Sequence, residues 1–130
     1  MILIDTDICI EILHKNERVV SERSKYDEDV AICFMSVAEL YFGSARSSDP
    51  ENNNALIEEF LITVDIIHTD LPILKRFGQV KSELRDQGYL LPDADILIAA
   101  TAYEKARLLV TGNTRHFDRF PNLRVENWIY

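Results

Sequence analysis

Short runs of consecutive hydrophobic residues alternate along the chain with segments in which hydrophobic residues recur every three or four positions. The continuous runs predict buried strands at 2–4, 30–34, 64–67 and 108–110, with a weaker fifth at 123–125. The periodic segments predict helices that bury one face, at 8–13, 16–25, 37–41, 56–61 and 73–84. The segment 96–103 is apolar on nearly all sides, which predicts a helix packed at the centre of the molecule.

Polar residues mark the expected ends of these elements. The stretch 47–54 is the most polar in the chain and predicts a loop that leads into a helix. Asp70 before Pro72 predicts a helix start, Gly88 predicts a helix end, and Asp93 is the expected N-cap of the apolar helix. Strands that alternate with helices favour a parallel sheet covered on both faces. We therefore expect a three-layer α/β/α fold with about five strands, in one domain spanning residues 1–130.

Size and composition narrow the class of protein. The chain has 130 residues, of which 47% are hydrophobic and 28% charged, and this suits one compact core. No apolar run approaches the roughly 18–20 residues of a membrane span, and the first residues do not resemble a signal peptide. The two cysteines, Cys9 and Cys33, lie in apolar segments without metal-ligand spacing. We expect buried free thiols and a cytoplasmic protein with no membrane partner.

Three acidic residues follow predicted strands, at the end where parallel sheets form their sites. Asp5 ends the first strand, and we place Glu39 and Asp95 in the first turns of the two helices that begin near Ser36 and Asp93. Asn113 follows the fourth strand at the same edge. Carboxylates gathered in one place repel one another unless a cation joins them. Oxygen ligands of this kind suit Mg²⁺ or Mn²⁺.

Each acid also has a purely structural explanation. Ser36 and Glu39 have the spacing of a capping box, in which Glu39 would only accept a backbone N–H. Asp95 would favour the dipole of its helix. Asp5 has the weakest structural explanation, because a carboxylate at the end of a buried strand is costly without a partner. All three explanations must hold together to remove the site, so we favour the functional interpretation.

The charge balance gives a mixed indication about partners. A net charge of −8 argues against nucleic acid, because phosphate contacts normally use Lys and Arg. A bound cation would reverse the local field and attract phosphate. Arg115, Arg119 and Arg124 flank the expected site and are candidate phosphate contacts. Nucleophilic triads and nucleotide-binding glycine loops find no support, since the histidines are scattered and the chain has only four glycines.

Four blocks of sequence, in the right order, resemble the PIN-domain nucleases and in particular the VapC toxins. Ile4-Asp5-Thr6-Asp7 resembles the opening of that family, Ser36 to Gly43 its second block, and Leu91 to Ala100 its third. Leu109 to Phe117, with Pro121 and Asn127-Trp128, resembles its C-terminal block. Two positions depart from the pattern. Asp7 stands where Asn is usual, and His116 stands where many members have Asp or Glu.

The resemblance implies an endoribonuclease that depends on Mg²⁺ or Mn²⁺, forms homodimers, and is held inactive by a cognate VapB-type antitoxin protein. Asp5, Glu39 and Asp95 match the acidic residues of the family, and the register of the third block places its acid at Asp95 and not at Asp93. His116 stands at a position where many members of the family have an acidic residue, so the presence of a fourth acidic ligand is left open. We therefore expect one tightly held ion.

In the mechanism that we expect, Asp5 and Asp95 hold the ion, and Glu39 completes the site directly or through water. Thr111 and Asn113 orient water or the scissile phosphate, and Arg115 contacts the substrate. The RNA target, transfer or ribosomal, is left open.

Two other functions remain compatible with the sequence. Asp5-Thr6-Asp7 also resembles the opening of haloacid-dehalogenase-like phosphatases, with Asp5 as a covalent nucleophile. An inactive PIN fold could instead act as a binding module.

Overall fold

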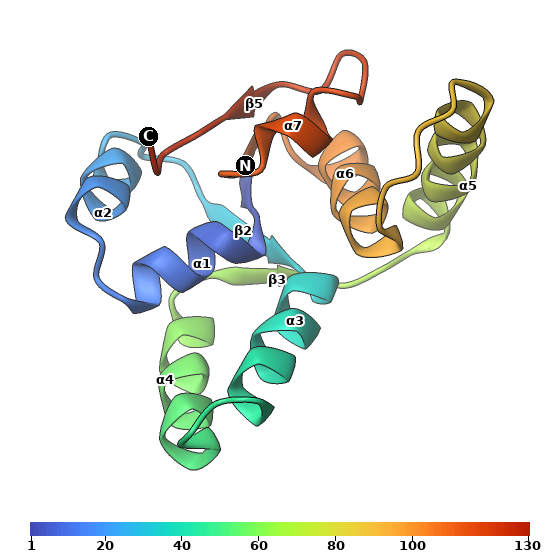
Figure 1. Cartoon of the computed structure of the whole chain (residues 1–130). Helices are drawn as coiled ribbons and strands as arrows, with labels where there is room; N and C mark the ends of the chain where they lie inside the picture. Colours follow the sequence, from blue (N-terminus) through green and yellow to red (C-terminus); the bar gives the residue numbers. More distant parts are fainter.

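The computed structural model describes residues 1–130 and has a five-stranded sheet in the order β3-β2-β1-β4-β5, with every pairing parallel (Figure 1). The strands are β1 (Ile2–Ile4), β2 (Val30–Cys33), β3 (Asp65–Ile67), β4 (Leu108–Val110) and β5 (Val125–Glu126). Ile4 pairs in register with Ile32 on one side and with Val110 on the other. The residues that follow β1 and β4 therefore meet at one edge of the sheet.

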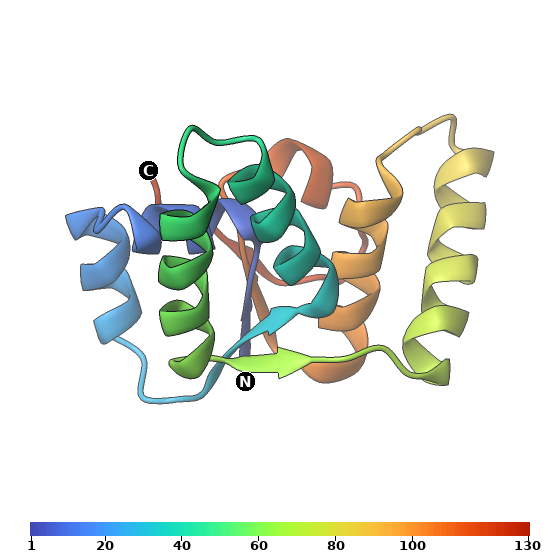
Figure 2. The same ribbon diagram turned by 90° about the horizontal axis from the view of Figure 1, so that it is seen from below.

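Seven helices cover the two faces of this sheet. They are α1 (Thr6–Leu13), α2 (Glu17–Ser24), α3 (Phe34–Ala45), α4 (Pro50–Ile62), α5 (Leu71–Asp86), α6 (Asp93–Lys105) and α7 (Thr114–Phe117). Alternate side chains of β1 enter two separate cores. Ile2 and Ile4 pack with the helices α1 to α4, whereas Leu3 packs with α5, α6 and α7. Figure 2 shows α5 outside α6, away from the sheet. The expected three-layer α/β/α fold is confirmed.

Local sequence explains most helix ends. Asp70 caps α5, because its side chain accepts a hydrogen bond from the N–H of Ile73. Gly88 follows α5 with φ of 81°, a left-handed conformation that glycine adopts without strain. Both expectations for this helix are confirmed. Cys9 and Cys33 are buried and free, as expected. No helix combines the length and apolar character that a membrane crossing requires.

Several expected boundaries were wrong. The polar stretch 47–54 does lead into a helix, but that helix begins at Pro50, capped by Asp49, earlier than the expected apolar stripe at 56–61. Pro92, not Asp93, is the N-cap of α6. Phe34 opens α3 and does not extend β2. The fifth strand lies at Val125–Glu126, and the short helix α7 had no hydrophobic period to indicate it.

Candidate active site at the carboxyl edge of the sheet

Asp5 follows β1 and lies almost out of contact with solvent, with 6% of its surface exposed. It is also the N-cap of α1, since Oδ1 accepts a hydrogen bond of 2.7 Å from the N–H of Thr6. Its other oxygen, Oδ2, accepts a hydrogen bond of 2.7 Å from the hydroxyl of Thr111, which follows the neighbouring strand β4. Adjacent parallel strands thus fix both oxygens of one buried carboxyl group.

The pKa of Asp5 is raised from 3.8 to about 7, and burial is the largest cause. The negative charge of Asp7 contributes to this rise, and that of Asp95 makes a smaller contribution. The hydrogen bonds from Thr111 and Thr6 oppose the shift without cancelling it. Asp5 therefore lies where a proton or a cation is strongly favoured over an isolated negative charge.

Asp7 adds a second, half-buried acid beside the first. Its Oδ2 accepts a hydrogen bond of 2.8 Å from the N–H of Gly112, but its buried Oδ1 has no hydrogen-bond partner. Burial raises the pKa of Asp7, and the charge of Asp95 also raises it. A Cβ atom at Gly112 would lie 2.7 Å from Oδ2 of Asp7 and 2.6 Å from the side chain of Ile129. Only glycine allows this close approach.

Asp95, in the first turn of α6, is bound to His116. The Oδ2 atom of Asp95 lies 2.6 Å from Nδ1 of His116, and 16% of the Asp95 side chain is exposed. The side-chain amide of Asn113 lies 2.9 Å from the same Nδ1, and its backbone N–H donates to Oγ1 of Thr111. Thr111 and Asn113 thus connect Asp5 with Asp95 through His116.

Glu39 makes a different contact from the one that a capping box predicts. Helix α3 begins at Phe34 and is capped by Cys33, so Glu39 lies in the second turn and not in the first. The hydroxyl of Thr6 donates to Oε1 of Glu39 at 2.7 Å, and this hydroxyl also lies 2.9 Å from Oγ of Ser36. The capping-box alternative is therefore wrong.

The expected convergence of three carboxylates on one point is only partly observed. No three Asp, Glu, His or Cys side chains are close enough together to form a ready metal site. Asp5 and Asp95 nevertheless fit a divalent ion, because Mg²⁺ is commonly held by one or two carboxylates with water completing the shell. The unpartnered Oδ1 of Asp7 and the raised pKa of Asp5 also favour a positive charge here.

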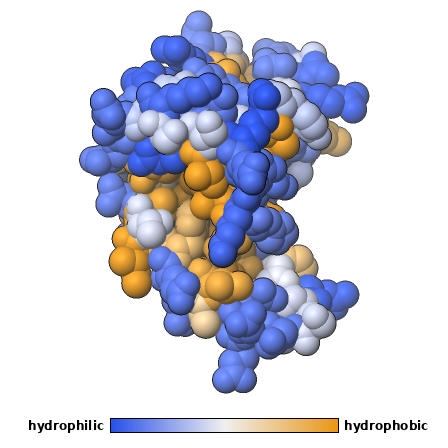
Figure 3. All heavy atoms as spheres, turned by 90° about the vertical axis from the view of Figure 1, so that its left-hand side faces the viewer, coloured by the Kyte–Doolittle hydropathy of each residue, from blue (hydrophilic) through white to orange (hydrophobic).

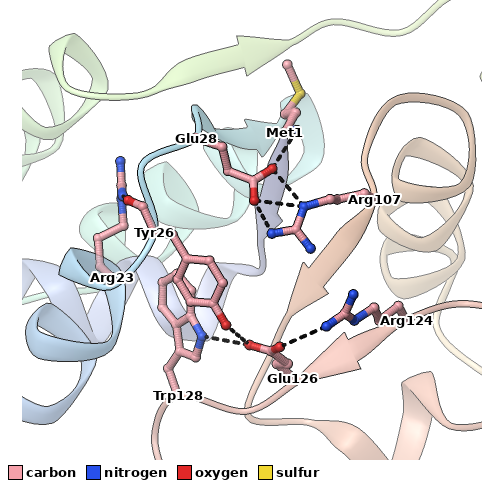
Figure 4. Close-up of polar contacts among 8 residues, drawn as sticks. All are labelled: Met1, Arg23, Tyr26, Glu28, Arg107, Arg124, Glu126 and Trp128. Atoms are coloured by element: carbon pink, nitrogen blue, oxygen red, sulfur yellow. Dashed lines mark hydrogen bonds and ion pairs between the residues drawn. The ribbon is translucent and has the colours of Figure 1, made fainter.

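The three arginines that we expected near the site lie in two different places. Arg115 and Arg119 line a pocket of about 390 Å³ that also includes Asn113 and His116. Arg124 precedes β5 at the opposite edge of the sheet, where it forms an ion pair of 3.8 Å with Glu126 (Figure 4). We expected Thr111 to bind substrate, but its hydroxyl group donates its hydrogen bond to Oδ2 of Asp5.

An apolar groove lies on the side of the molecule that carries α1, α2 and α4 (Figure 3). One pocket of about 290 Å³ is formed by α1, α3 and α4, and its walls include Ile10, Leu40, Ile57 and Glu39. A second, of about 410 Å³, lies beside α2 and α4 and includes Val20 and Phe60. Glu39 therefore belongs both to the edge of the candidate site and to this groove.

Sequence reasoning missed the roles of Thr6 and Ser36: the hydroxyl of Thr6, in α1, hydrogen-bonds both Glu39 and Ser36, in α3. Their positions in the first and second blocks were the only available signal. Asp7 and His116 were noted only as departures from the family pattern, and both prove to contact the site directly.

Comparisons with known proteins extend this geometry to a family. Residues 2–123 match the PIN domain family. Ribonuclease VapC2 of Haemophilus influenzae is 36% identical over 128 residues, which cover 98% of this chain and 97% of that protein. The tRNA(fMet)-specific endonuclease VapC of Shigella flexneri is 34% identical over 127 residues, which cover 97% of this chain and 96% of that protein.

Solved structures give the same result for the fold. The structure of VapBC2 from Rickettsia felis bound to a DNA fragment from its promoter contains a similar chain, with a TM-score of 0.91 and 32% identity. The similarity covers 98% of this chain and 99% of that chain. Fold, buried acidic edge and sequence relatives agree, and the chain belongs to the PIN domain family.

Proposed function

We propose that this protein is an endoribonuclease that acts as the toxin of a toxin–antitoxin pair and is neutralised by a VapB-type antitoxin. Its relatives from Haemophilus influenzae and Shigella flexneri are named as a ribonuclease and a tRNA-specific endonuclease. The observation that carries the proposal within the structure is the buried carboxyl of Asp5, which lies beside Asp95 and Asp7 at the edge of the sheet. The free thiols favour a reducing compartment, and we place the protein in the cytoplasm.

PIN-domain ribonucleases generally depend on a divalent metal ion. We assign Asp5 and Asp95 as the residues that hold it, with Mg²⁺ or Mn²⁺ as the ion, because all the donors are carboxylate oxygens. When bound, such an ion stabilises negative charge on a phosphoryl group and makes a bound water more acidic.

The residues of the chain itself prepare this site. Thr111 and the N–H of Thr6 orient the carboxylate of Asp5, and its proton must leave before the carboxylate can hold a cation. His116 orients Asp95 through the contact of 2.6 Å, with Asn113 beside it. Glu39, fixed by Thr6, completes the acidic edge. Arg115, which is exposed and forms no ion pair, contacts the RNA backbone.

Transfer RNA is the first substrate to test, because the relatives from Shigella flexneri and Salmonella typhimurium are both named for tRNA(fMet). The apolar groove formed by α1, α3 and α4 is where we place an antitoxin segment, since Glu39 lines it and a bound segment would reach the acidic edge. Oligomeric state is a separate expectation, and we propose a homodimer.

The experiment is RNA cleavage by purified protein with Mg²⁺, comparing wild type with Asp5→Asn and Asp95→Asn. An amide is a poorer Mg²⁺ ligand than a carboxylate, so both variants should lose cleavage and growth inhibition while staying folded. Asp93→Asn is the matched control, because Asp93 lies on the same helix but is exposed and pairs with Lys81. Full activity in both site variants, at matched expression, would contradict the assignment.

The phosphatase alternative is not favoured. Both oxygens of Asp5 accept hydrogen bonds, and the group is 6% exposed, which leaves little access for in-line attack on a phosphate ester. A covalent aspartyl-phosphate on Asp5 would be the result in its favour.

A further inference from the structure

A polar pocket of about 390 Å³ opens beside the acidic edge, between the α5–α6 connection and α7. Residues 88–91 of the connection form one wall, and Asn113, Arg115, His116 and Arg119 form the other. His116 belongs both to this pocket and to the contact with Asp95. The pocket is therefore continuous with the proposed active site.

The charge of this pocket suits an anion. Arg115 and Arg119 take part in none of the ion pairs of the molecule, and no acidic side chain lines the pocket. Two guanidinium groups without acidic partners thus face one cavity in a chain with a net charge of −8. Arginine is well suited to bind phosphate oxygens, because its N–H groups match their geometry.

The same pocket also has a flat, partly apolar wall. The guanidinium carbon of Arg119 lies over the Tyr89 ring, 4.0 Å from its centre, in a cation–π contact. Leu90, beside Tyr89, is 83% exposed. Unpaired bases of RNA stack on aromatic rings and on guanidinium planes, and every base has a face suited to this contact.

We propose that this pocket binds one unpaired nucleotide of the RNA substrate next to the scissile phosphate. Arg115 contacts the backbone phosphate of that nucleotide, and the Tyr89–Arg119 pair stacks on its base. This inference rests on the proposed ribonuclease function and assigns the contact with an unpaired base to Tyr89 and Arg119, because a base inside a duplex is not free to enter the pocket.

The test is binding of a fluorescent single-stranded oligoribonucleotide in the presence of chelator, so that no cleavage intervenes. Tyr89→Ala and Tyr89→Leu should weaken binding by about five- to a hundredfold without changing its salt dependence. Arg115→Gln should instead reduce the slope of log affinity against log salt by about 0.7. Arg18→Gln, at an exposed arginine of α2, is the matched control and should change neither. A duplex of the same sequence should bind wild type no better than single strands bind the Tyr89 variants.

The outcomes separate this inference from the function on which it rests. If wild type cleaves RNA but the folded Tyr89 and Arg115 variants bind like wild type, the pocket is not a nucleotide site and the ribonuclease proposal stands. If the variants lose binding as described but wild type cleaves no RNA with Mg²⁺ or Mn²⁺, the nucleotide site stands and the ribonuclease proposal is overturned. Melting temperatures of the variants check that a binding loss does not come from unfolding.

Discussion

Asp5 and Asp7 lie two residues apart at the start of α1, and burial raises the pKa of both. The folded chain therefore holds a proton on Asp5 between pH 3.8 and about 7 that the unfolded chain has lost. A protein whose native state binds more protons than its unfolded state loses stability as the pH rises through that range. Without metal, this protein should be more stable at pH 5 than at pH 8 as far as Asp5 is concerned.

Replacing Asp7 by Asn should reduce the loss of stability that occurs as the pH rises. The amide keeps an oxygen for the N–H of Gly112 but removes the charge that raises the pKa of Asp5. We expect Asp7→Asn to gain about 0.5–2 kcal/mol of stability at pH 8 in chelator, as is common when repulsion in a site is relieved. The measurement is denaturant unfolding at pH 5 and pH 8. Asp93→Asn is the control, and an identical pH dependence in wild type and Asp7→Asn would refute the coupling.

Glu39→Gln separates charge from hydrogen bonding. The amide oxygen still accepts from the hydroxyl of Thr6, but the negative charge is gone. We expect RNA cleavage to fall by about 10- to 100-fold, the range for residues that support a metal site, with little change in melting temperature. Thr6→Val removes the donor and keeps the charge, so it reports orientation alone. Wild-type cleavage by Glu39→Gln would leave Glu39 with only a structural role.

The sequence was sufficient to place Asp5 and Asp95, because a carboxylate directly after a buried strand, or in the first turn of an apolar helix, has a defined position at the sheet edge. It was not sufficient for Glu39, whose partner Thr6 lies 33 residues away and belongs to another helix. The contact of Asp7 was equally impossible to predict, since it depends on the close approach of Gly112, 105 residues further along the chain.

Among the elements, the short strand β5 supports the site by holding the backbone of Thr111, which positions Asp5. The carbonyl of Glu126 accepts a hydrogen bond of 2.9 Å from the N–H of Thr111, whose hydroxyl in turn holds Asp5. The side chains of Tyr26 and Trp128 contact Glu126 and hold this strand in place (Figure 4). The hydroxyl of Tyr26 donates to Glu126 at 2.6 Å, and the Tyr26 ring stacks on Trp128 with 5.6 Å between centroids.

Trp128→Ala should therefore cost about 3–5 kcal/mol of unfolding free energy, because the indole is 1% exposed and its loss leaves a cavity. Tyr26→Phe keeps the ring and should cost only about 1 kcal/mol, the contribution of one hydrogen bond. Hydrogen exchange at the N–H of Thr111 should be faster in Trp128→Ala than in Tyr26→Phe. Equal stability of wild type and Trp128→Ala would show that the C-terminal segment does not support the sheet.

Hydrophobic pattern located most strands and the longer helices, but it did not place α7 or the bounds of β5. The runs at β1, β2 and β4 are buried on both faces and so read as continuous apolar sequence. Helix α7 has four residues, too few to show a period, and β5 has two. The N-cap of α6 was misplaced because Asp93 is a good capping residue by type, whereas its carboxylate pairs with Lys81 across the gap to α5.

At the scale of the whole molecule, the net charge of −8 is distributed unevenly. The buried Asp5 and the half-buried Asp7 and Asp95 lie near one another at the sheet edge, and unpaired arginines line the pocket next to them. The unpaired arginines allow a chain that is negative overall to bind RNA. A cation that neutralises the acids lets the scissile phosphate approach them, so cleavage depends on a cation that binds to the folded protein.

Thermal melting with and without metal shows whether the folded protein binds this cation through Asp5 and Asp95. Wild type should gain RT ln(1 + [L]/Kd), about 2.7 kcal/mol at a hundredfold excess of Mg²⁺ or Mn²⁺ over Kd, and should melt at a higher temperature than in chelator. Asp95→Asn should show almost no rise, whereas Asp93→Asn, with its exposed side chain, should rise like wild type. If wild type melts at the same temperature in chelator and in millimolar metal, or if Asp95→Asn rises as much as wild type, Asp5 and Asp95 do not hold a metal ion.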